Sequence, residues 1–407
     1  MTGVSPMLAI RAGSLFDGER ALGPGTVLIR AGQIAGIDTS GAALPADSVV
    51  HDFGDGVTVM PGLIDCHVHL SLDASPKAMA NVAAEDDDAL LRRMAGAATK
   101  ALHAGITTVR DLGDRRYLSL ELRDHLARNA IPAPRIVAAG PPVTTRGGHL
   151  AVLGGEAEGA DELTAAVEER ARRGCEVVKV VASGGVTTLG STPHIAQYGP
   201  KDLRLVVDRA RERGLSTAAH VHAVASIADA LAARFDSLEH VTFFTAEGIA
   251  SDQRLIEQIA ESRTFVSLTV GSVPGLAKPP AAVAQRMEQI LGNAARLCSA
   301  GARVVVGTDA GLSPGKPHDV LPYALDALVD LGLSPLRALH AVTDVAADAC
   351  GLRGIKGRLA RGADADLIAI NGDPLTEISA IHNVVAVYRD GHLVVAQRSP
   401  ERDAEDS

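Results

Sequence analysis

Hydrophobic positions follow two alternating patterns between residues 61 and 362. Short runs rich in valine, isoleucine and leucine alternate with longer stretches in which apolar residues recur every three or four positions. The runs are typical of strands buried on both faces of a parallel sheet, and the stretches are typical of amphipathic helices. The eight runs are GLIDCHVHL, GITTVRDLG, RIVAAG, VVKVVASGG, STAAHVHA, SLEHV, TFVSLTV and RVVVGTDAG. This alternation predicts an α/β fold, a (β/α)8 TIM-like barrel.

Helices are expected between these strands. In the first of them Leu90, Leu91, Met94, Ala98 and Leu102 recur at helical spacing. The helices that show such a pattern are expected over residues 85–103, 160–173, 200–213, 247–261 and 280–300.

The two ends of the chain lack helical periodicity and have the pattern of short strands and turns. Residues 1–60 and 363–399 share this pattern. We therefore expect them to pair into one small β-sandwich domain, which the barrel of residues 61–362 interrupts. Residues 400–407 are polar and are expected to be a disordered tail.

Residue types that bind metals stand at the ends of the predicted strands, where the active sites of such barrels lie. His67 and His69 are one residue apart, so their side chains point to the same side of the first strand. A single His-x-His pair is weak evidence, and each histidine alone could be structural. Together the set predicts a metal site: His67, His69, Lys179, His220, His222, His240 and Asp309.

Lys179 is unexpected inside a strand of this kind. An ammonium group repels metal cations and is costly to bury. One interpretation is that its stem packs in the core while its head reaches water. The other is that carbon dioxide carboxylates the amine, which gives an anionic carbamate able to bridge two ions.

Composition and net charge limit the kinds of molecule that the protein is expected to bind. Hydrophobic residues make up 46% and charged residues 22%, which is ordinary for a globular protein. The net charge of −10, with no basic run, argues against nucleic acid or an anionic membrane as the main partner. No signal peptide or membrane-spanning segment is expected. The four cysteines are far apart and form no C-x-x-C pair, which favours a reduced, cytoplasmic location.

Motifs along nearly the whole chain are similar to those of the amidohydrolase superfamily, in its imidazolonepropionase-like and Xaa-Pro dipeptidase (prolidase) branch. They are PGLIDCHVH, GITTVRDLG, TTRGGH, VKVVASGG, AAHVHA, LEHVTF, GTDAG and G-x-x-ADLIAINGDP. The resemblance implies a homo-oligomeric hydrolase with two divalent metal ions. Nitrogen and oxygen ligands without thiolate favour zinc, with manganese or cobalt as replacements.

The resemblance also implies which residues bind the ions. His67 and His69, with Asp309, would hold the more buried ion. His220 and His240 would hold the second ion. The carbamate formed on Lys179 from CO2 would bridge both. His222 lies on the same strand face as His220, so the sequence leaves it open as the ligand in place of His220.

These ligands imply a mechanism for amide hydrolysis. Two ions that share a water lower its pKa toward ~7, so that a metal-bridged hydroxide can attack the amide carbonyl. Asp309 would accept the proton and pass it to the leaving amine. By resemblance, His149 would face the substrate near the metals, while Tyr198 and Arg146 would recognise a substrate carboxylate. Arg110 and the adjacent Asp111 are expected to form a structural pair.

The substrate expected from these residues is a small amide, either an Xaa-Pro dipeptide or an N-acyl amino acid. The same scaffold could hydrolyse a cyclic amide, an aryl amide, a urea or a carbamate. A non-catalytic scaffold is the contrasting possibility, but the presence of every ligand-type residue argues against it.

Overall fold

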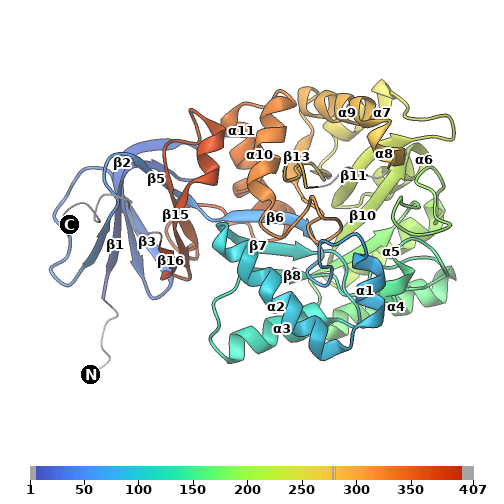
Figure 1. Cartoon of the computed structure of the whole chain (residues 1–407), viewed down its shortest axis with the longest axis horizontal. Helices are drawn as coiled ribbons and strands as arrows, with labels where there is room; N and C mark the ends of the chain where they lie inside the picture. The colour runs from blue at the N-terminus through green and yellow to red at the C-terminus, as the bar shows by residue number, and fades with distance from the viewer. Residues whose placement is uncertain (1–5, 277–278, 280, 397–407) are drawn as a thin grey trace.

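The computed structural model describes residues 6–276, 279 and 281–396. Figure 1 shows two parts, a β domain on the left and parallel strands surrounded by helices on the right. The expected tail of residues 400–407 lies outside the described residues, as do residues 397–399 of the expected β domain.

The β domain combines strands from both ends of the chain. Its strands are β1 (Leu8–Phe16), β2 (Ala21–Arg30), β3 (Gln33–Asp38), β4 (Val49–Asp52), β5 (Val57–Pro61), β14 (Leu367–Asn371), β15 (Val384–Arg389) and β16 (His392–Ala396). The order is β16-β15-β14-β5-β1-β2-β3, and β4 pairs with β1. The sheet of the β domain is mixed, because β1 pairs in parallel with β4 and β5 while the other strand pairs are antiparallel. Where the sequence predicted a sandwich, the pairing is one continuous sheet, because β14 runs antiparallel to β5 and joins the two chain ends.

This sheet encloses its own apolar core. Ile10 of β1, Val27 of β2, Ile34 of β3 and Tyr388 of β15 pack in one cluster and are almost fully buried. Burial of these apolar side chains on one face stabilises the sheet. Alternate residues of a strand point to opposite faces, so every second residue can contribute to this core. The chain leaves this sheet between β5 and β6 and returns to it at β14. We therefore propose that the boundaries between the β domain and the rest of the chain lie near residues 60 and 363.

Each of the eight predicted runs overlaps one parallel strand. These strands are β6 (Leu63–Val68), β7 (Ile106–Asp111), β8 (Arg135–Ala138), β9 (Val177–Val181), β10 (Ser216–Ala223), β11 (Ser237–Phe244), β12 (Phe265–Leu268) and β13 (Arg303–Val306). They form two parallel sheets, β6-β7-β8 and β13-β12-β11-β10-β9. Isolated parallel bridges, Val143 to Val180 and Val68 to Ala310, join the edges of the two sheets. The predicted α/β class with parallel strands is confirmed.

Helices follow the strands and cover them (Figure 1). They are α1 (Ala78–Ala84), α2 (Asp87–His103), α3 (Leu118–Arg128), α4 (Gly159–Arg173), α5 (Pro200–Glu212), α6 (Val224–Ala233), α7 (Gln253–Glu261), α8 (Ala281–Ala284), α9 (Met287–Ser299), α10 (Leu321–Asp330), α11 (Pro335–His340) and α12 (Asp344–Ala349), with 3-10 turns η1 (Ala151–Leu153) and η2 (Ile378–His382). Within the described residues, none of them has the length and apolarity needed to cross a membrane.

Capping residues explain where two helices begin. The sequence predicted helices from residues 85 and 247, whereas α2 and α7 start later. The side chain of Asp86 accepts a hydrogen bond from the backbone N–H of Ala89, and Asp252 does the same for Leu255. Aspartate at the residue before a helix satisfies a backbone N–H that the helix leaves unpaired, so these carboxylates set the two starts.

Candidate metal centre

The predicted metal-binding residues meet in one cavity of about 620 Å³. The cavity lies where the parallel strands end. All seven candidate ligands from the sequence line it, together with His149: His67, His69, Lys179, His220, His222, His240 and Asp309. Residues from five strands or strand ends (β6, β9, β10, β11 and β13) are therefore brought together, as the strand-end pattern predicted.

His67, His69 and Asp309 form a compact group, which we call the first triad. Asp309 Oδ1 lies 3.6 Å from His67 Nε2 and 3.4 Å from His69 Nε2, and the two Nε2 atoms are 3.4 Å apart. The other nitrogen of each ring is already engaged, His67 Nδ1 with Glu239 and His69 Nδ1 with the carbonyl oxygen of Gly113. Such contacts fix the orientation of each ring, and the two Nε2 atoms face Asp309, as they would in a shared metal site.

Glu239 is a buried residue of the site that the sequence reasoning missed. Its Oε2 lies 3.0 Å from His67 Nδ1, and its Oε1 accepts a hydrogen bond of 3.0 Å from Arg110 Nη2. Burial by itself raises the pKa of Glu239, but Arg110 and His67 outweigh burial and hold that pKa well below its usual range. Glu239 is therefore an anion that orients His67. A glutamate within a strand predicted to be fully buried was the available signal.

The expected pair between Arg110 and Asp111 is not formed. Adjacent strand residues point to opposite faces, so the two side chains of β7 diverge. Arg110 reaches Glu239 and also donates to the carbonyl oxygen of Cys66. Asp111 instead accepts hydrogen bonds from the backbone N–H groups of Leu70 and of Gly113.

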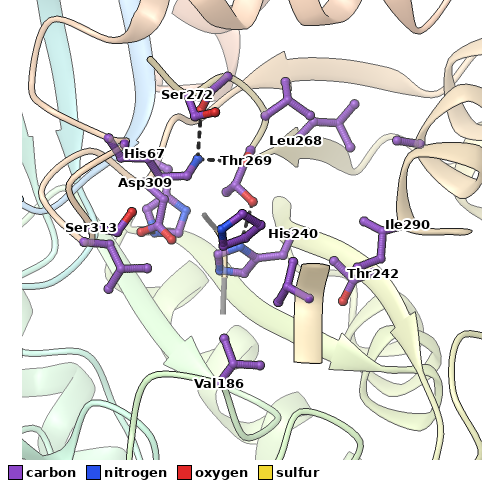
Figure 2. Close-up of a pocket in the computed structure, with 18 of the residues that line it drawn as sticks. His67, Val186, His240, Thr242, Leu268, Thr269, Ser272, Ile290, Asp309 and Ser313 are labelled. Atoms are coloured by element: carbon purple, nitrogen blue, oxygen red, sulfur yellow. Dashed lines mark hydrogen bonds and ion pairs between the residues drawn. The ribbon is translucent and has the colours of Figure 1, made fainter. Parts of the chain in front are cut away.

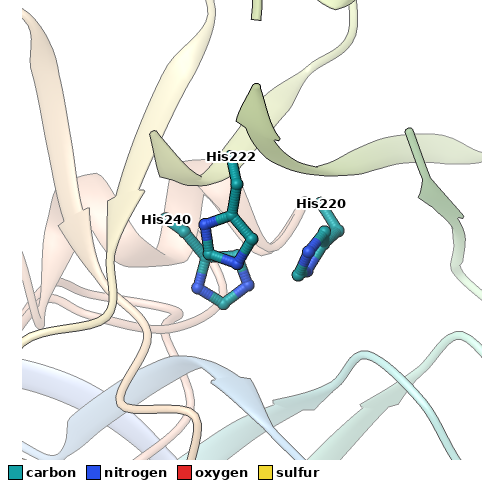
Figure 3. Close-up of side chains that lie close together, drawn as sticks. All are labelled: His220, His222 and His240. Atoms are coloured by element: carbon teal, nitrogen blue, oxygen red, sulfur yellow. The ribbon is translucent and has the colours of Figure 1, made fainter. Parts of the chain in front are cut away.

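His220, His222 and His240 form a second triad, shown in Figure 3. One nitrogen of each ring lies within 4.8 Å of one nitrogen of each of the others. His222 Nδ1 contacts the hydroxyl of Thr242 at 2.7 Å, and His240 Nδ1 contacts the hydroxyl of Thr269 at 3.0 Å. Neutral hydroxyls thus orient two of these rings. The geometry brings His222 as close as His220, so the choice between them stays open.

Burial keeps the second triad uncharged. It lowers the pKa of His222 to about 4, and it holds the pKa values of His220 and His240 well below the usual range, aided by the neighbouring histidines. Imidazoles with such pKa values are neutral at pH 7. The neutral ring is the form that binds metal.

The backbone at two candidate ligands is strained. Asp309 has φ +61°, and the end of β11 has φ +71° at His240 and +52° at Val241. Residues other than glycine held in this left-handed region cost about 1–3 kcal/mol each and gather at functional sites. The strain therefore indicates that the fold is built to aim these two side chains.

Lys179 is fully buried on β9, and its Nζ has no hydrogen-bond partner among the described residues. Burial lowers the pKa of Lys179 to about 8. A buried ammonium without a partner is costly, and the neutral amine that burial favours is the form that reacts with carbon dioxide. The first triad offers two imidazoles and a carboxylate and the second offers three imidazoles, and both donor sets suit a divalent metal ion.

His149 lines the cavity, as the resemblance predicted. Its ring centroid lies 4.8 Å from that of His220, and its Nδ1 contacts the hydroxyl of Thr188 at 2.8 Å. Burial lowers the pKa of His149 to about 3, so the ring is neutral at pH 7. A Cβ at Gly185 would lie 2.4 Å from His149 Nε2, which explains why glycine is needed beside the ring. Gln197 supports the loop by accepting a hydrogen bond from the backbone N–H of His149.

Tyr198 and Arg146 do not line the cavity. The Tyr198 hydroxyl donates to the carbonyl oxygen of Ala157 at 2.8 Å. Arg146 donates two hydrogen bonds to Glu162 and one to Glu158, and 56% of its side chain is exposed. Nearby acidic residues thus hold Arg146 at the surface. Of the three groups predicted to contact substrate, the structure brings only His149 to the metal-binding residues.

Lys316 lines the cavity and is another residue that the sequence reasoning missed. Its Nζ donates to the carbonyl oxygens of Thr269, Gly271 and Thr308 at 3.0, 3.2 and 2.6 Å. Dashed lines near Thr269 in Figure 2 mark contacts of this kind. Lys316 therefore ties the end of β12, which carries the hydroxyl partner of His240, to the end of β13, which leads to Asp309.

Comparison with known proteins finds relatives that match most of the chain. The model of the amidohydrolase family matches residues 58–394. Ochratoxinase of Aspergillus niger is 29% identical over 379 residues, covering 82% of this chain and 75% of that protein. Imidazolonepropionase of Deinococcus deserti is 26% identical over 402 residues, covering 92% of each chain. The crystal structure of a Xaa-Pro dipeptidase with methionine in its active site superposes with a TM-score of 0.84 and 26% identity, covering 96% of this chain and all of that one. The chain therefore belongs to the amidohydrolase family, in its prolidase-like branch.

Proposed function

We propose that this protein is a binuclear metal-dependent hydrolase that cleaves the C–N bond of an amide. The observation that carries the proposal is the arrangement of two metal-binding triads and an unpartnered buried lysine around one cavity. The similarity to an ochratoxinase, an imidazolonepropionase and a Xaa-Pro dipeptidase supports hydrolysis of an amide.

The nitrogen and oxygen atoms of the two triads support an assignment of residues to each metal ion. His67, His69 and Asp309 would hold one ion. His220 and His240, or His222 in place of His220, would hold the other. A carbamate on Lys179 would connect them. Zinc suits imidazole and carboxylate ligands, and two such ions supply Lewis acidity toward a carbonyl oxygen and a lowered pKa for water.

Asp309 is the proposed proton carrier. Burial alone raises its pKa, but contacts with His69 and His67 outweigh burial and hold the pKa below its usual range. The carboxylate is thus ionised at pH 7 and can accept a proton from the attacking water. It can then deliver that proton to the leaving amine, as a general base that becomes a general acid.

His149 and Glu239 have two further roles in the proposed reaction. His149 is neutral and lines the cavity, so its ring can donate a hydrogen bond to the amide carbonyl as charge develops there. Glu239, held by Arg110, keeps the ring of His67 in one orientation. Glu239 therefore acts through His67 as a positioning residue.

The amide class is better supported than a particular substrate. Dipeptides and N-acyl amino acids were expected partly because Tyr198 and Arg146 were to bind a carboxylate, and neither lines the cavity. A cyclic amide, an aryl amide, a urea or a carbamate also meets the requirement of a carbonyl next to nitrogen. We also propose that the two parallel sheets act as a single (β/α)8 barrel, since bridges link both pairs of edges.

The proposal is tested by removing and restoring the metal. Purified protein is treated with a chelator, dialysed and assayed for amine release from a panel of dipeptides, N-acyl amino acids and anilides. We expect turnover to disappear after chelation and to return when Zn²⁺ is added. Turnover that survives complete metal depletion would contradict the proposal, and so would its absence from zinc-loaded protein across the whole panel.

A further inference from the structure

Apolar side chains cover a large part of the cavity away from the triads. On α9 the lining residues Met287, Ile290, Leu291 and Ala294 recur on one helical face. Leu150 and Val186 from the loops, Phe244 from β11 and Leu268 from β12 extend this surface, which we call the apolar wall. Figure 2 shows Ile290 on the opposite side of the cavity from His67 and Asp309.

Half of the apolar wall is incompletely buried, while Leu150, Phe244, Leu268 and Ala294 are buried. Met287, Ile290 and Val186 are only half-buried, and 36% of Leu291 is exposed. Apolar groups gathered around a concave site are favoured when a ligand covers them, because covering them removes apolar surface from water. A cavity of about 620 Å³ accommodates a bulky group beside the metal-binding residues.

The lining residues that the structure describes offer no free cation for a carboxylate. Among the described lining residues the ammonium groups belong to Lys179 and Lys316. Lys316 already directs all three of its N–H donors to backbone carbonyls, and Lys179 is the proposed carbamate. Arg146 is paired at the surface. Arg286 packs over the ring of Phe244 but is not a lining residue.

Two acidic residues instead lie along one side of the cavity. Asp326 and Asp330 of α10 are lining residues, and Asp330 is exposed. Asp326 contacts His382 at 2.7 Å. A substrate carboxylate near these residues would meet like charge, and the cost of leaving a carboxylate unpaired makes such a substrate unfavourable.

We infer that the apolar wall receives a bulky, uncharged aromatic or branched group of the substrate amide, and that a free carboxylate is not required for recognition. This inference names the substrate class of the proposed hydrolase and therefore rests on the proposed function. It replaces the expectation of a small amide held through its carboxylate.

Binding to metal-depleted protein tests the inference without requiring hydrolysis. Calorimetry compares three anilides: N-phenyl-2-naphthamide, acetanilide and N-(4-carboxyphenyl)-2-naphthamide. We expect the first to bind at least about 100-fold more tightly than acetanilide, since each buried carbon of a well-filled apolar site adds discrimination. The carboxylated compound should bind no more tightly than its neutral parent. Equal binding of acetanilide, or tenfold tighter binding of the carboxylated compound, would overturn the inference.

Two wall variants localise the binding. Ile290→Asn and Val186→Asn lie on different elements, so failure of one to fold leaves the other as a test. Each should lower the ratio of naphthamide to acetanilide affinity by about tenfold. Ile131→Asn is the matched control, because Ile131 is 44% exposed and is not a lining residue. An unchanged ratio in a folded wall variant would contradict the assignment.

Failure of this inference is distinguishable from failure of the proposed function. Tight, selective binding of N-phenyl-2-naphthamide without hydrolysis after zinc is restored would contradict the catalytic proposal alone. Zinc-dependent hydrolysis of a dipeptide, combined with equal binding of the three anilides, would contradict the apolar wall alone.

Discussion

The two triads hold similar ligands by different means. In the first triad a fully buried ion pair, Glu239 with Arg110, fixes His67. In the second triad the threonine hydroxyls of Thr242 and Thr269 orient the rings. The first triad thus contains one carboxylate, Asp309, and a second carboxylate, Glu239, lies behind His67, whereas the second triad contains no carboxylate. An anionic support raises the basicity of an imidazole more than a neutral hydroxyl does, so the two ions should differ in affinity.

The difference also explains the place of Lys179. A second ion held by neutral imidazoles alone lacks an anionic ligand. A carbamate would supply that charge. In the proposed centre the lysine would therefore be most important to the triad that has no carboxylate of its own, and the variants below test this asymmetry.

The largest effect is expected from Lys179→Ala. Removing the bridging carbamate should abolish turnover and release the ion of the second triad first, because neutral ligands alone hold it. Metal content and amine release measure both changes, and a short carboxylic acid such as propionate should partly restore them by filling the space. Lys201→Ala, at an exposed position on α5, is the control. A Lys179→Ala protein that keeps its second ion would disprove the role.

Asp309→Asn should have the next largest effect. Asparagine keeps the shape of the side chain but cannot accept the proton, so turnover should fall by about two to four orders of magnitude. The rate is measured on protein whose metal content has been restored, because the first triad also loses a charged ligand. Near wild-type turnover at full metal content would rule out Asp309 as the proton carrier.

Glu239→Gln probes the charged support of the first triad. The amide can still contact His67 and Arg110, but the negative charge is lost. We expect affinity for the ion of the first triad to fall by about 10- to 100-fold, the usual effect of changing a residue that orients a ligand. Competition with a chromophoric chelator measures the affinity. An unchanged affinity would mean that Glu239 serves only to neutralise Arg110.

Thr269→Val is the matched change in the second triad and should have the smallest effect. It removes a single neutral hydrogen bond to His240 while keeping a similar volume. The affinity for the second ion should fall by about fivefold, which corresponds to one uncharged hydrogen bond. If this loss equalled that of Glu239→Gln, the contrast between charged and neutral support would be wrong.

The sequence predicted the parts of the site that depend on strand periodicity. His67, His69, Lys179, His240 and Asp309 all line the cavity. They could be located because a residue near the end of a buried parallel strand lies at the edge of the sheet where the neighbouring parallel strands also end. The α/β class followed from the same alternation.

Loop residues could not be placed in this way. Arg146 lies near histidine and glycine in the sequence, but the acidic residues Glu158 and Glu162 pair with it in space. Lys316 reaches the carbonyl oxygens of segments that are distant in the sequence. Such contacts depend on how loops fold over one another, and a single sequence carries no periodic signal for them.

The central claim is a binuclear centre bridged by a modified lysine. Its most direct test is an anomalous-scattering map, at the absorption edge of zinc, from crystals of zinc-loaded protein. The account predicts two peaks, one at each triad, and density for a carboxylate group beyond Nζ of Lys179. A single peak, or two peaks beside an unmodified lysine amine, would contradict it.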